Sequence, residues 1–432
     1  MKKVGIVSLG CMKNLVDSEN ILGLFDRNGY EITNNPKEAD VILINTCGFI
    51  ESSKKESIEN ILEMLSYKKK VVVTGCLVER YLDELKKEIP EVDLYIPIRE
   101  YEKFNKKFYV LDNSVDPSIG VDDEYRIVST GPYSAYLKIG EGCDNRCSYC
   151  AIPLIRGGFK SRDYDAIIKE AKELASSGIK EIVVLEQDTT KYGIDFKDKK
   201  VNIVDLLKGL LEIKELEYIR LLYLYPDEIS DELIDLIGKE SRLTPYFDIP
   251  IQHSESHILK DMYRRGDKEF LINLFTKIRK RVPNAILRTT VMVGFPGEKE
   301  EDVDNLIKFI EEVKFDHLGA FTYSQEEGTP AALFTNQVNE DDKKKRLAKV
   351  MKAQQKVSYI QNKKHIGEVM RGLVVGKDDH GNNLLRSYWN APDDVDGKIF
   401  FTSKKELHNG DIVKVKITDA FVYDLMGEEV DE

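Results

Sequence analysis

Three thiols fall within eight positions in the stretch Gly142-Cys143-Asp144-Asn145-Arg146-Cys147-Ser148-Tyr149-Cys150. It follows a short apolar run, residues 135–139, that predicts a β-strand. Thiolates this close together can hold one soft metal centre from a single loop. A structural zinc site would need a fourth ligand nearby, usually from a second Cys-x-x-Cys or a His pair, and neither follows. The spacing therefore favours a metal centre with three protein ligands and one open position; the alternatives are a zinc knuckle or a cysteine-rich surface loop.

The order of residues in this stretch resembles the signature of the radical S-adenosylmethionine (SAM) enzymes. The spacing is Cys-x₃-Cys-x₂-Cys, and an aromatic residue, Tyr149, precedes the third cysteine. The resemblance implies a 4Fe–4S cluster held by Cys143, Cys147 and Cys150, whose fourth iron binds the amino and carboxylate groups of SAM.

The composition predicts a globular protein of several domains. Its 432 residues correspond to about three domains of roughly 150 residues, and 42% hydrophobic residues suffice for apolar cores. No apolar run approaches the roughly 20 residues of a membrane span. The short apolar run near the start ends at Lys13 without a cleavage site. Six cysteines without an export signal indicate a reducing compartment, so we expect a cytoplasmic protein with no membrane partner.

Strands and helices alternate in the first third of the chain. The predicted strands are near-continuous apolar runs at residues 4–9, 41–45 and 71–74. Helices are predicted at residues 14–28, 57–64 and 81–88. This alternation predicts a parallel sheet covered on both faces. A cysteine follows each strand (Cys11, Cys47 and Cys76), and open parallel sheets bind ligands at the carboxyl ends of their strands. We expect these thiols to converge; the alternative is that they fill the core.

The alternation resumes on a longer scale beyond a polar segment, residues 112–131, that is typical of a linker. Strands are predicted at residues 135–140, 181–186, 218–225, 246–251, 285–293 and 317–323. Six βα units favour a partial barrel, short of the eight that close a complete one. Polar clusters follow four of these strands, at residues 186–190, 225–227, 252–254 and 294–298. Active-site residues should lie at such ends, although each cluster alone fits an ordinary loop, and His253 alone a structural role.

The chain ends in a charged helix and a predicted small β-barrel. The helix, residues 341–364, has an apolar stripe that we expect to pack on the partial barrel: Leu347, Val350, Met351, Val357 and Ile360. Five short strands are predicted at residues 368–375, 383–387, 398–402, 411–417 and 419–424. Residues 366–432 contain 14 acidic and 8 basic residues, a net charge of −6, and the whole chain carries −12. A barrel that clamps RNA should be basic, so we expect no direct nucleic-acid binding.

Nearly the whole chain resembles the methylthiotransferases, a family of radical-SAM enzymes. The motifs that carry the likeness are Leu9-Gly10-Cys11-Met12-Lys13-Asn14, Asn45-Thr46-Cys47-Gly48-Phe49-Ile50 and Thr74-Gly75-Cys76-Leu77, with Met12 where the family often has proline. The resemblance implies an N-terminal α/β domain (1–118), a linker (119–131), a radical-SAM partial barrel with its trailing helix (132–364) and a β-barrel called the TRAM domain (365–432).

Three further motifs resemble the ribosomal-protein branch of this family, the RimO type. They are Gln187-Asp188-Thr189-Thr190-Lys191-Tyr192-Gly193, Phe247-Asp248-Ile249-Pro250-Ile251-Gln252-His253 and Ala391-Pro392-Asp393-Asp394-Val395-Asp396-Gly397. Ser254-Glu255 departs from the Gly or Ala that often follows the histidine. The resemblance implies insertion of a methylthio group at the β-carbon of an aspartate in small-subunit ribosomal protein twelve. The alternatives are a transfer-RNA adenosine methylthiotransferase and, more distantly, an iron–sulfur carrier or electron-transfer protein.

The resemblance also implies two 4Fe–4S clusters and two uses of SAM. Cys143, Cys147 and Cys150 would hold the cluster that reduces SAM to a radical. Cys11, Cys47 and Cys76 would hold an auxiliary cluster that carries the sulfur, which a second SAM methylates. The predicted SAM contacts, from position alone, are Tyr149, Gln187 and Gly294. The expected electron donor is a flavodoxin or ferredoxin, and the expected substrate partner is the ribosomal protein or the ribosome.

The acidic C-terminal barrel suits a basic ribosomal protein as its partner. We therefore expect Asp393, Asp394 and Asp396 to attract the substrate. Removal of residues 366–432 should on this view weaken substrate binding and spare SAM cleavage.

Overall fold

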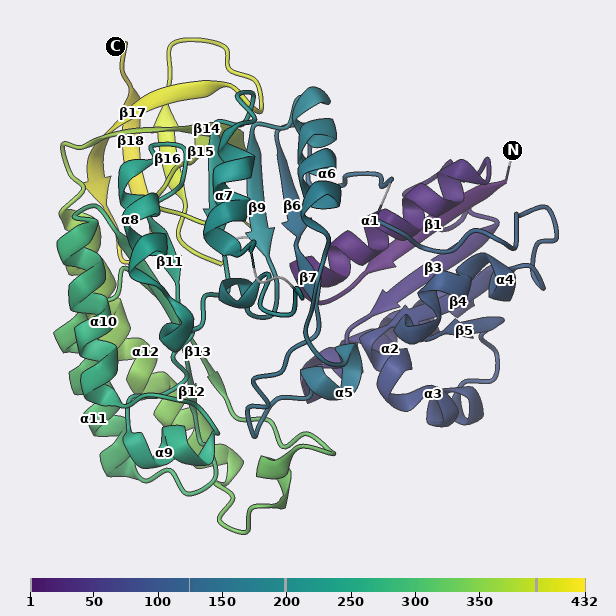
Figure 1. Cartoon of the computed structure of the whole chain (residues 1–432), viewed down its shortest axis with the longest axis horizontal. Helices are drawn as coiled ribbons and strands as arrows, with labels where there is room; N and C mark the ends of the chain where they lie inside the picture. Colours follow the sequence, from purple (N-terminus) through teal and green to yellow (C-terminus); the bar gives the residue numbers. More distant parts are fainter. Residues whose placement is uncertain (1, 124, 198–199, 393–394, 432) are drawn as a thin grey trace.

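The computed structural model describes residues 2–123, 125–197, 200–392 and 395–431, and Figure 1 shows three sheet-based regions along the chain. The N-terminal region, purple in Figure 1, contains a parallel sheet in the order β2-β1-β3-β4-β5. Its strands are β1 (Lys3–Ser8), β2 (Glu31–Ile32), β3 (Val41–Thr46), β4 (Lys70–Gly75) and β5 (Leu94–Ile96). Its helices are α1 (Met12–Arg27), α2 (Glu51–Ser66), α3 (Cys76–Glu88) and α4 (Phe104–Phe108).

Helices cover both faces of this sheet, as the apolar runs predict. Leu43 and Val72 pack with α1 and α4 on one face, while Ile44 and Val73 pack with α2 and α3 on the other. Two details differ from the prediction. The two-residue strand β2 was not expected, because it has no apolar run. Helix α3 begins at Cys76 and continues across a kink at Tyr81, where the sequence pattern places the helix start.

The central region is a partial barrel of parallel strands, as predicted. The strands are β6 (Ser134–Lys138), β9 (Glu181–Leu185), β10 (Tyr218–Leu221), β11 (Tyr246–Asp248), β12 (Ile286–Val293) and β13 (His317–Thr322). They form two sheets, β6-β9-β10 and β11-β12-β13, which meet where Ile219 pairs with Leu243 just before β11. A short antiparallel pair, β7 (Gly140–Glu141) and β8 (Lys160–Ser161), follows β6.

Helices form the outer layer of the partial barrel (Figure 1). They are α6 (Tyr164–Ser176), α7 (Ile203–Leu211), α8 (Asp231–Lys239), α10 (Lys268–Arg281), α11 (Glu300–Val313) and α12 (Glu340–Lys363). Two short helices, α5 (Ile152–Arg156) and α9 (Ser256–Asp261), lie instead in the loops past the ends of β7 and β11. None of the helices formed by the described residues has both the length and the apolar character needed to cross a membrane.

Most of the apolar stripe on α12 packs on the partial barrel, as predicted. Val350 and Val357 are buried, and Leu347 and Met351 contact the same core. The prediction is wrong for Ile360, whose exposed fraction is 57%. The last turn of α12 instead buries polar side chains; Gln361, for example, donates to the Asp316 carboxylate at 2.9 Å.

The C-terminal region, yellow in Figure 1, is a closed five-stranded barrel in the order β14-β15-β16-β18-β17, as predicted. Its strands are β14 (Val369–Lys377), β15 (Asn383–Arg386), β16 (Ile399–Thr402), β17 (Ile412–Ala420) and β18 (Leu425–Glu429). The predicted strand at residues 419–424 is wrong. Those residues end β17 and form a turn, in which the Phe421 N–H donates to the Asp424 carbonyl at 2.8 Å.

The closed barrel is fastened to the partial barrel by buried groups. Trp389 is fully buried and meets the His317 ring edge-on, with ring centroids 4.7 Å apart. The Asp396 carboxylate accepts a hydrogen bond from the Tyr246 hydroxyl at 2.5 Å and lies 3.4 Å from the Arg288 Nε. Asp396 is therefore an internal anchor, and the expectation that it attracts a substrate from the surface is wrong. Asp393 and Asp394, named in the same expectation, lie outside the described residues.

Helix α1 packs between the N-terminal sheet and the partial barrel. Its Asp17 pairs with Lys138 of β6 and with Arg156 of α5, both at 2.5 Å. Its Glu19 pairs with Arg126 at 2.5 Å and accepts from the Ser129 N–H at 2.7 Å. Since charges buried together at this distance resist separation, α1 fixes the cysteine-bearing edge of the N-terminal sheet against the partial barrel.

Candidate functional site

The three N-terminal cysteines meet at the carboxyl edge of their sheet. Cys11 follows β1, Cys47 follows β3 and Cys76 begins α3 directly after β4, and these strands are neighbours. The order β2-β1-β3-β4-β5 reverses direction between β1 and β3, which is where open parallel sheets bind ligands. Gly10 has a φ of +91°, and a Cβ there would lie 3.0 Å from the Cys47 Sγ. Glycine at this position thus lets the first thiol approach the second.

The surroundings of this N-terminal triad differ from one thiol to the next. Cys47 and Cys76 are buried, while Cys11 is exposed. Burial raises the pKa of Cys76 to about 11, and the thiols of Cys11 and Cys47 act in the same direction. The Arg156 guanidinium opposes both effects. The convergence expected of these three cysteines is therefore present in the structure.

The second triad lies in the loop between β7 and α5, past the end of β6. Burial raises the pKa of Cys150 to about 12, and the neighbouring Cys147 and Cys143 thiols add to the effect. The Asn145 side chain in this loop donates to the Asp188 carboxylate at 2.7 Å. Because Asp188 belongs to the polar cluster that follows β9, that cluster holds the cysteine loop in place.

The sulfur atoms of each triad lie farther apart than the ligands of a single metal ion. One group of three among the described side chains, Glu255, His257 and Asp302, has possible ligand atoms all within 4.8 Å of one another. Neither cysteine triad is that compact, whereas a tetrahedral zinc ion, with Zn–S bonds of about 2.3 Å, would hold its sulfurs about 3.8 Å apart. Three thiols at wider spacing fit a multi-iron cluster, the larger centre that cysteine triads bind.

A buried arginine contacts one sulfur of each triad. The Arg156 Nη2 lies 3.4 Å from the Cys76 Sγ and donates to the Asn14 side chain at 3.0 Å. The Arg264 Nη1 lies 3.8 Å from the Cys147 Sγ, and its guanidinium stacks over the Tyr225 ring at 4.3 Å. Sequence reasoning missed both arginines, because neither has a fixed spacing from the cysteine that it contacts.

The predicted SAM contacts lie close to the second triad or at the strand ends. Tyr149 lies inside the cysteine loop, and its hydroxyl is 3.4 Å from the Arg264 Nη1. Gln187 follows β9, and its side chain donates to Glu141 at 3.3 Å. The side-chain amide oxygen of Gln187 has no hydrogen-bond partner among the described residues. The Gly294 N–H already donates to the Glu298 carboxylate at 2.8 Å. The role of all three in SAM binding stays a prediction.

Packing explains two conspicuous residues, Gly294 at the end of β12 and His253 past the end of β11. A Cβ on Gly294 would lie 2.3 Å from the Lys343 Cγ, so α12 requires glycine here. His253 is fully buried, accepts from the Glu255 N–H and faces the Glu298 carboxylate at 3.4 Å. These contacts fit the structural role that the sequence favours for His253.

Two buried polar side chains meet where α1 reaches the ends of β9 and β10. The Lys13 Nζ lies 3.6 Å from the centre of the Tyr223 ring and 3.4 Å from the backbone carbonyl of Glu186. The Glu186 side chain is fully buried, and neither of its oxygens has a hydrogen-bond partner. Burial, assisted by the nearby Glu141, raises the pKa of Glu186 to about 8, so this carboxyl group is largely protonated at neutral pH.

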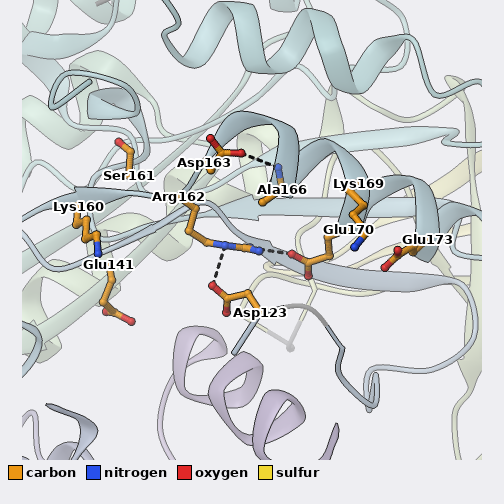
Figure 2. Close-up of a pocket in the computed structure, with 10 residues that line it drawn as sticks. All are labelled: Asp123, Glu141, Lys160, Ser161, Arg162, Asp163, Ala166, Lys169, Glu170 and Glu173. Carbon is orange, nitrogen blue, oxygen red and sulfur yellow. Dashed lines mark hydrogen bonds and ion pairs between the residues drawn. The ribbon is translucent and has the colours of Figure 1, made fainter. Parts of the chain in front are cut away.

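A polar cavity of about 440 Å³ lies beside this region, between the linker and α6 (Figure 2). Figure 2 shows Arg162 at its centre, bonded to Asp123 of the linker and Glu170 of α6. The residues that line it include no cysteine. The arginine in this cavity is paired with carboxylates. The cavity meets the surroundings of the cysteines at Glu141, which also pairs with Arg156 at 3.2 Å and accepts from Gln187 at 3.3 Å.

Three family models match successive parts of the chain. The model described as Uncharacterized protein family UPF0004 matches residues 3–97, that of the Radical SAM superfamily matches residues 137–310, and that of the TRAM domain matches residues 366–430. These matches follow the N-terminal sheet, the partial barrel and the closed barrel in order.

Curated relatives match over the full length. The ribosomal protein uS12 methylthiotransferase RimO of Caldicellulosiruptor saccharolyticus is 47% identical over 443 aligned residues, with 100% of both chains covered. The protein of the same name from Alkaliphilus oremlandii is 46% identical, with 98% of both chains covered.

Solved structures show the same fold at much lower identity. The radical S-adenosylmethionine methyltransferase TsrM from Kitasatospora setae, solved with cobalamin and a 4Fe-4S cluster, matches with a TM-score of 0.56 at 13% identity over 77% of each chain. The cobalamin-dependent S-adenosylmethionine radical enzyme OxsB matches with a TM-score of 0.52 at 12% identity, covering 81% of this chain and 56% of that one. The full-length relatives are far closer, and they establish that this chain is an enzyme and belongs to the RimO family of radical-SAM methylthiotransferases.

Proposed function

We propose that this enzyme methylthiolates ribosomal protein uS12 at the β-carbon of an aspartate. The observation that carries the proposal is the pair of cysteine triads, one at the carboxyl ends of β1, β3 and β4 and the other in the loop past the end of β6. The chain that bears them aligns end to end with uS12 methylthiotransferases. The net charge of −6 on residues 366–432 supports a basic protein partner over RNA. The substrate would be met as free uS12 or within the ribosome.

The proposal assigns each cysteine triad to one 4Fe–4S cluster. Cys143, Cys147 and Cys150 would hold the first, and Cys11, Cys47 and Cys76 the second. With two molecules of SAM, the bound clusters would supply electron transfer to SAM, a carbon-centred radical and the sulfur that is methylated and inserted. A flavodoxin or ferredoxin would provide the electron.

In this scheme the chain's own residues position and shield the reacting groups. Arg264 and Tyr225 enclose the Cys147 sulfur, and Tyr149, Gln187 and Gly294 are the proposed SAM contacts. Such groups act by orientation and by exclusion of water. The proposed domains are the N-terminal α/β domain (1–118), the radical-SAM partial barrel with its trailing helix (132–364) and the C-terminal barrel (365–432). Residues 119–131 are the proposed linker.

Mass spectrometry of anaerobic reactions tests the substrate. The reconstituted enzyme is incubated with SAM, a reductant and either uS12 or transfer RNA. We expect the mass gain of one methylthio group in uS12, retained on an aspartate during fragmentation, and no change in the RNA. A methylthiolated adenosine would establish the transfer-RNA alternative instead. An enzyme that cleaves no SAM under these conditions would support the iron–sulfur carrier.

Alanine variants test the two cluster assignments. Replacing either triad should leave about four irons per chain, because the other triad still binds its cluster. Cys147→Ala should abolish 5′-deoxyadenosine formation. Cys47→Ala should still form 5′-deoxyadenosine but no methylthio product. Loss of all iron from either triple variant while it remains folded would refute the assignment of two separate clusters.

A further inference from the structure

Lys13 is a buried ammonium group that forms no ion pair with any described side chain. Among the described residues three lysines are buried: Lys13, Lys138 and Lys343. Lys138 pairs with Asp17 at 2.5 Å, and Lys343 pairs with Glu340 at 2.7 Å. Lys13 is 7% exposed, and its Nζ contacts only the Tyr223 ring and the Glu186 backbone carbonyl among the described groups. A charge taken out of water is normally paired with an opposite charge beside it. Cys11 and Glu141 attract Lys13 from farther away, so its ammonium can still pair directly with a bound anion.

The side chain next to Lys13 does not supply that charge. Glu186 is fully buried and has no hydrogen-bond partner on either oxygen. With a pKa of about 8, it is mainly a neutral carboxyl group at pH 7. A neutral carboxyl carries an O–H donor, so the pair can offer an ammonium and a hydroxyl to one incoming anion.

The location of Lys13 connects it with the reaction. It lies two residues after Cys11, in the first turn of α1, and it faces Tyr223 just past the end of β10. The carboxyl ends of barrel strands are where such barrels place their active sites. An anion bound by Lys13 would therefore lie between the N-terminal triad and the mouth of the partial barrel.

We propose that Lys13, with Glu186 beside it, binds the side-chain carboxylate of the aspartate that the enzyme modifies. The proposal rests on the proposed function and adds to it the group that selects an acidic side chain. A site built to pair with a charge rejects the uncharged analogue strongly, because its own charge is then left buried and unpaired. Lys13 would thus orient the aspartate and exclude asparagine.

Lys13 could instead bind the carboxylate of SAM, or it could stabilise the thiolate of Cys11. The two possibilities predict different outcomes. If Lys13 binds the SAM carboxylate, its replacement weakens SAM binding. If Lys13 supports Cys11, its replacement changes the spectrum of the N-terminal cluster. In both cases the preference for aspartate over asparagine stays as it was.

The experiment compares two forms of uS12, with aspartate or asparagine at the target position, binding to the reconstituted full-length enzyme in the presence of SAM. We expect the wild-type enzyme to prefer the aspartate form by about 30-fold or more, the cost of leaving one partner of a buried charge pair alone. Lys13→Gln should reduce that preference to less than about threefold. Lys13→Arg, which keeps the charge, should retain part of it.

The matched control is Lys208→Gln, which removes one positive charge from the outer helix α7, where Lys208 is half-exposed and pairs with Glu232 at 3.0 Å. It should keep the full preference. Iron content and circular dichroism check that each variant is folded. Equal binding of both uS12 forms by the wild-type enzyme, or an unchanged preference in folded Lys13→Gln, would overturn the proposal. If Lys13→Gln does not fold, Lys13→Met takes its place, and an unchanged preference in that folded variant would equally overturn the proposal. Failure of the wild-type enzyme to modify uS12 at all would count against the proposed function instead.

Discussion

At the scale of single residues, Glu186 is a buried carboxyl group with a raised pKa. Its side chain is fully buried at the end of β9, and its pKa is raised to about 8 by burial and by the nearby Glu141. The usual value for this group in the unfolded chain is 4.5. Between these two pH values the unfolded chain has released the proton that the folded chain still holds. Stability must therefore fall as the pH rises from about 4.5 to about 8.

Replacing Glu186 by glutamine should remove this penalty. Below pH 4.5 both states of the wild-type group are protonated, so the two proteins should have similar stability. Above that pH the difference in the free energy of unfolding should grow in favour of the variant by up to about 1.4 kcal/mol per pH unit. It should level off near pH 8. Thermal unfolding of the reconstituted proteins from pH 5 to pH 9 measures the difference. A difference that does not vary with pH would show that Glu186 is not held protonated.

At the scale of elements, the short helix α5 connects the two cysteine triads. It starts two residues after Cys150 and ends at Arg156, which reaches across to the Cys76 sulfur at 3.4 Å. The same guanidinium pairs with Asp17 of α1 at 2.5 Å. Because α5 is short and directly follows the loop of the second triad, a displacement of that loop would also move Arg156, which faces the first triad.

We expect Arg156→Lys to lower the reduction potential of the N-terminal centre. The guanidinium brings a hydrogen bond and a positive charge to Cys76, and with the proposed cluster bound both would favour the added electron. Methylthio transfer should fall by about 10- to 100-fold, as is typical when a group that supports a metal ligand is changed. Redox titration followed by electron paramagnetic resonance measures the potential.

Arg264→Lys is the matched control for this prediction, because Arg264 lies against Cys147 of the other triad at 3.8 Å. It should shift the potential of the second centre and leave that of the first. Equal shifts of both centres in both variants would indicate a general loss of structure. No shift in either variant would mean that these arginines do not tune the clusters.

At the scale of the whole molecule, the closed barrel forms part of the folded core. It shares one apolar cluster with the partial barrel, in which Trp389 and Tyr246 are both fully buried. Arg386 also pairs with Glu181 of β9 at 3.0 Å. Removal of residues 366–432 would expose that cluster and remove one of the two arginines that pair with Glu181, leaving Arg220 at 3.4 Å. The expectation that such a deletion spares SAM cleavage is therefore replaced by the expectation that it destabilises the partial barrel.

Asp396→Lys tests this joint with one substitution. Burial against Tyr246 raises the pKa of Asp396, but His317, Arg288 and the hydrogen bond from Tyr246 outweigh it and hold the pKa below its usual value. Reversing the charge should cost about 3–5 kcal/mol, because it breaks a buried charge network. Asp419→Lys, on the exposed face of β17, should change stability by no more than about 0.5 kcal/mol. Equal effects in thermal unfolding would show that the joint contributes little.

Substrate attraction by the barrel is better tested at its exposed acids than at Asp396. Reversing Asp379, Glu406, Asp419 and Glu428 together, all exposed, should slow the association of basic uS12 by about tenfold or more at low salt. The effect should shrink as the salt concentration rises, because exposed charges are screened over about 8 Å at physiological ionic strength. Stopped-flow binding measures the rate. An unchanged association rate would exclude the closed barrel as the attracting surface.

The order of the three structural regions and the candidate metal ligands can be predicted from the sequence alone. Near-continuous apolar runs predict parallel strands, and these strands are found in both α/β regions. The cysteines could be proposed as two triads because one set is adjacent in sequence and the other follows strand ends, which meet at one edge in any parallel sheet. These signals are local or follow from the geometry of a sheet, so they can be read without coordinates.

The side chains that surround those triads are apparent only from the tertiary structure. Arg156 and Cys76 are 80 residues apart, and no periodicity in the sequence relates them. Asp396 belongs to an acidic stretch typical of a surface, yet it is buried because the closed barrel packs on Tyr246. Lys13 follows an apolar run in the sequence, and its burial against Tyr223 and the Glu186 backbone is apparent only when α1 lies against the partial barrel. Burial and charge pairing depend on which distant segments meet, and that is settled by packing of the whole chain.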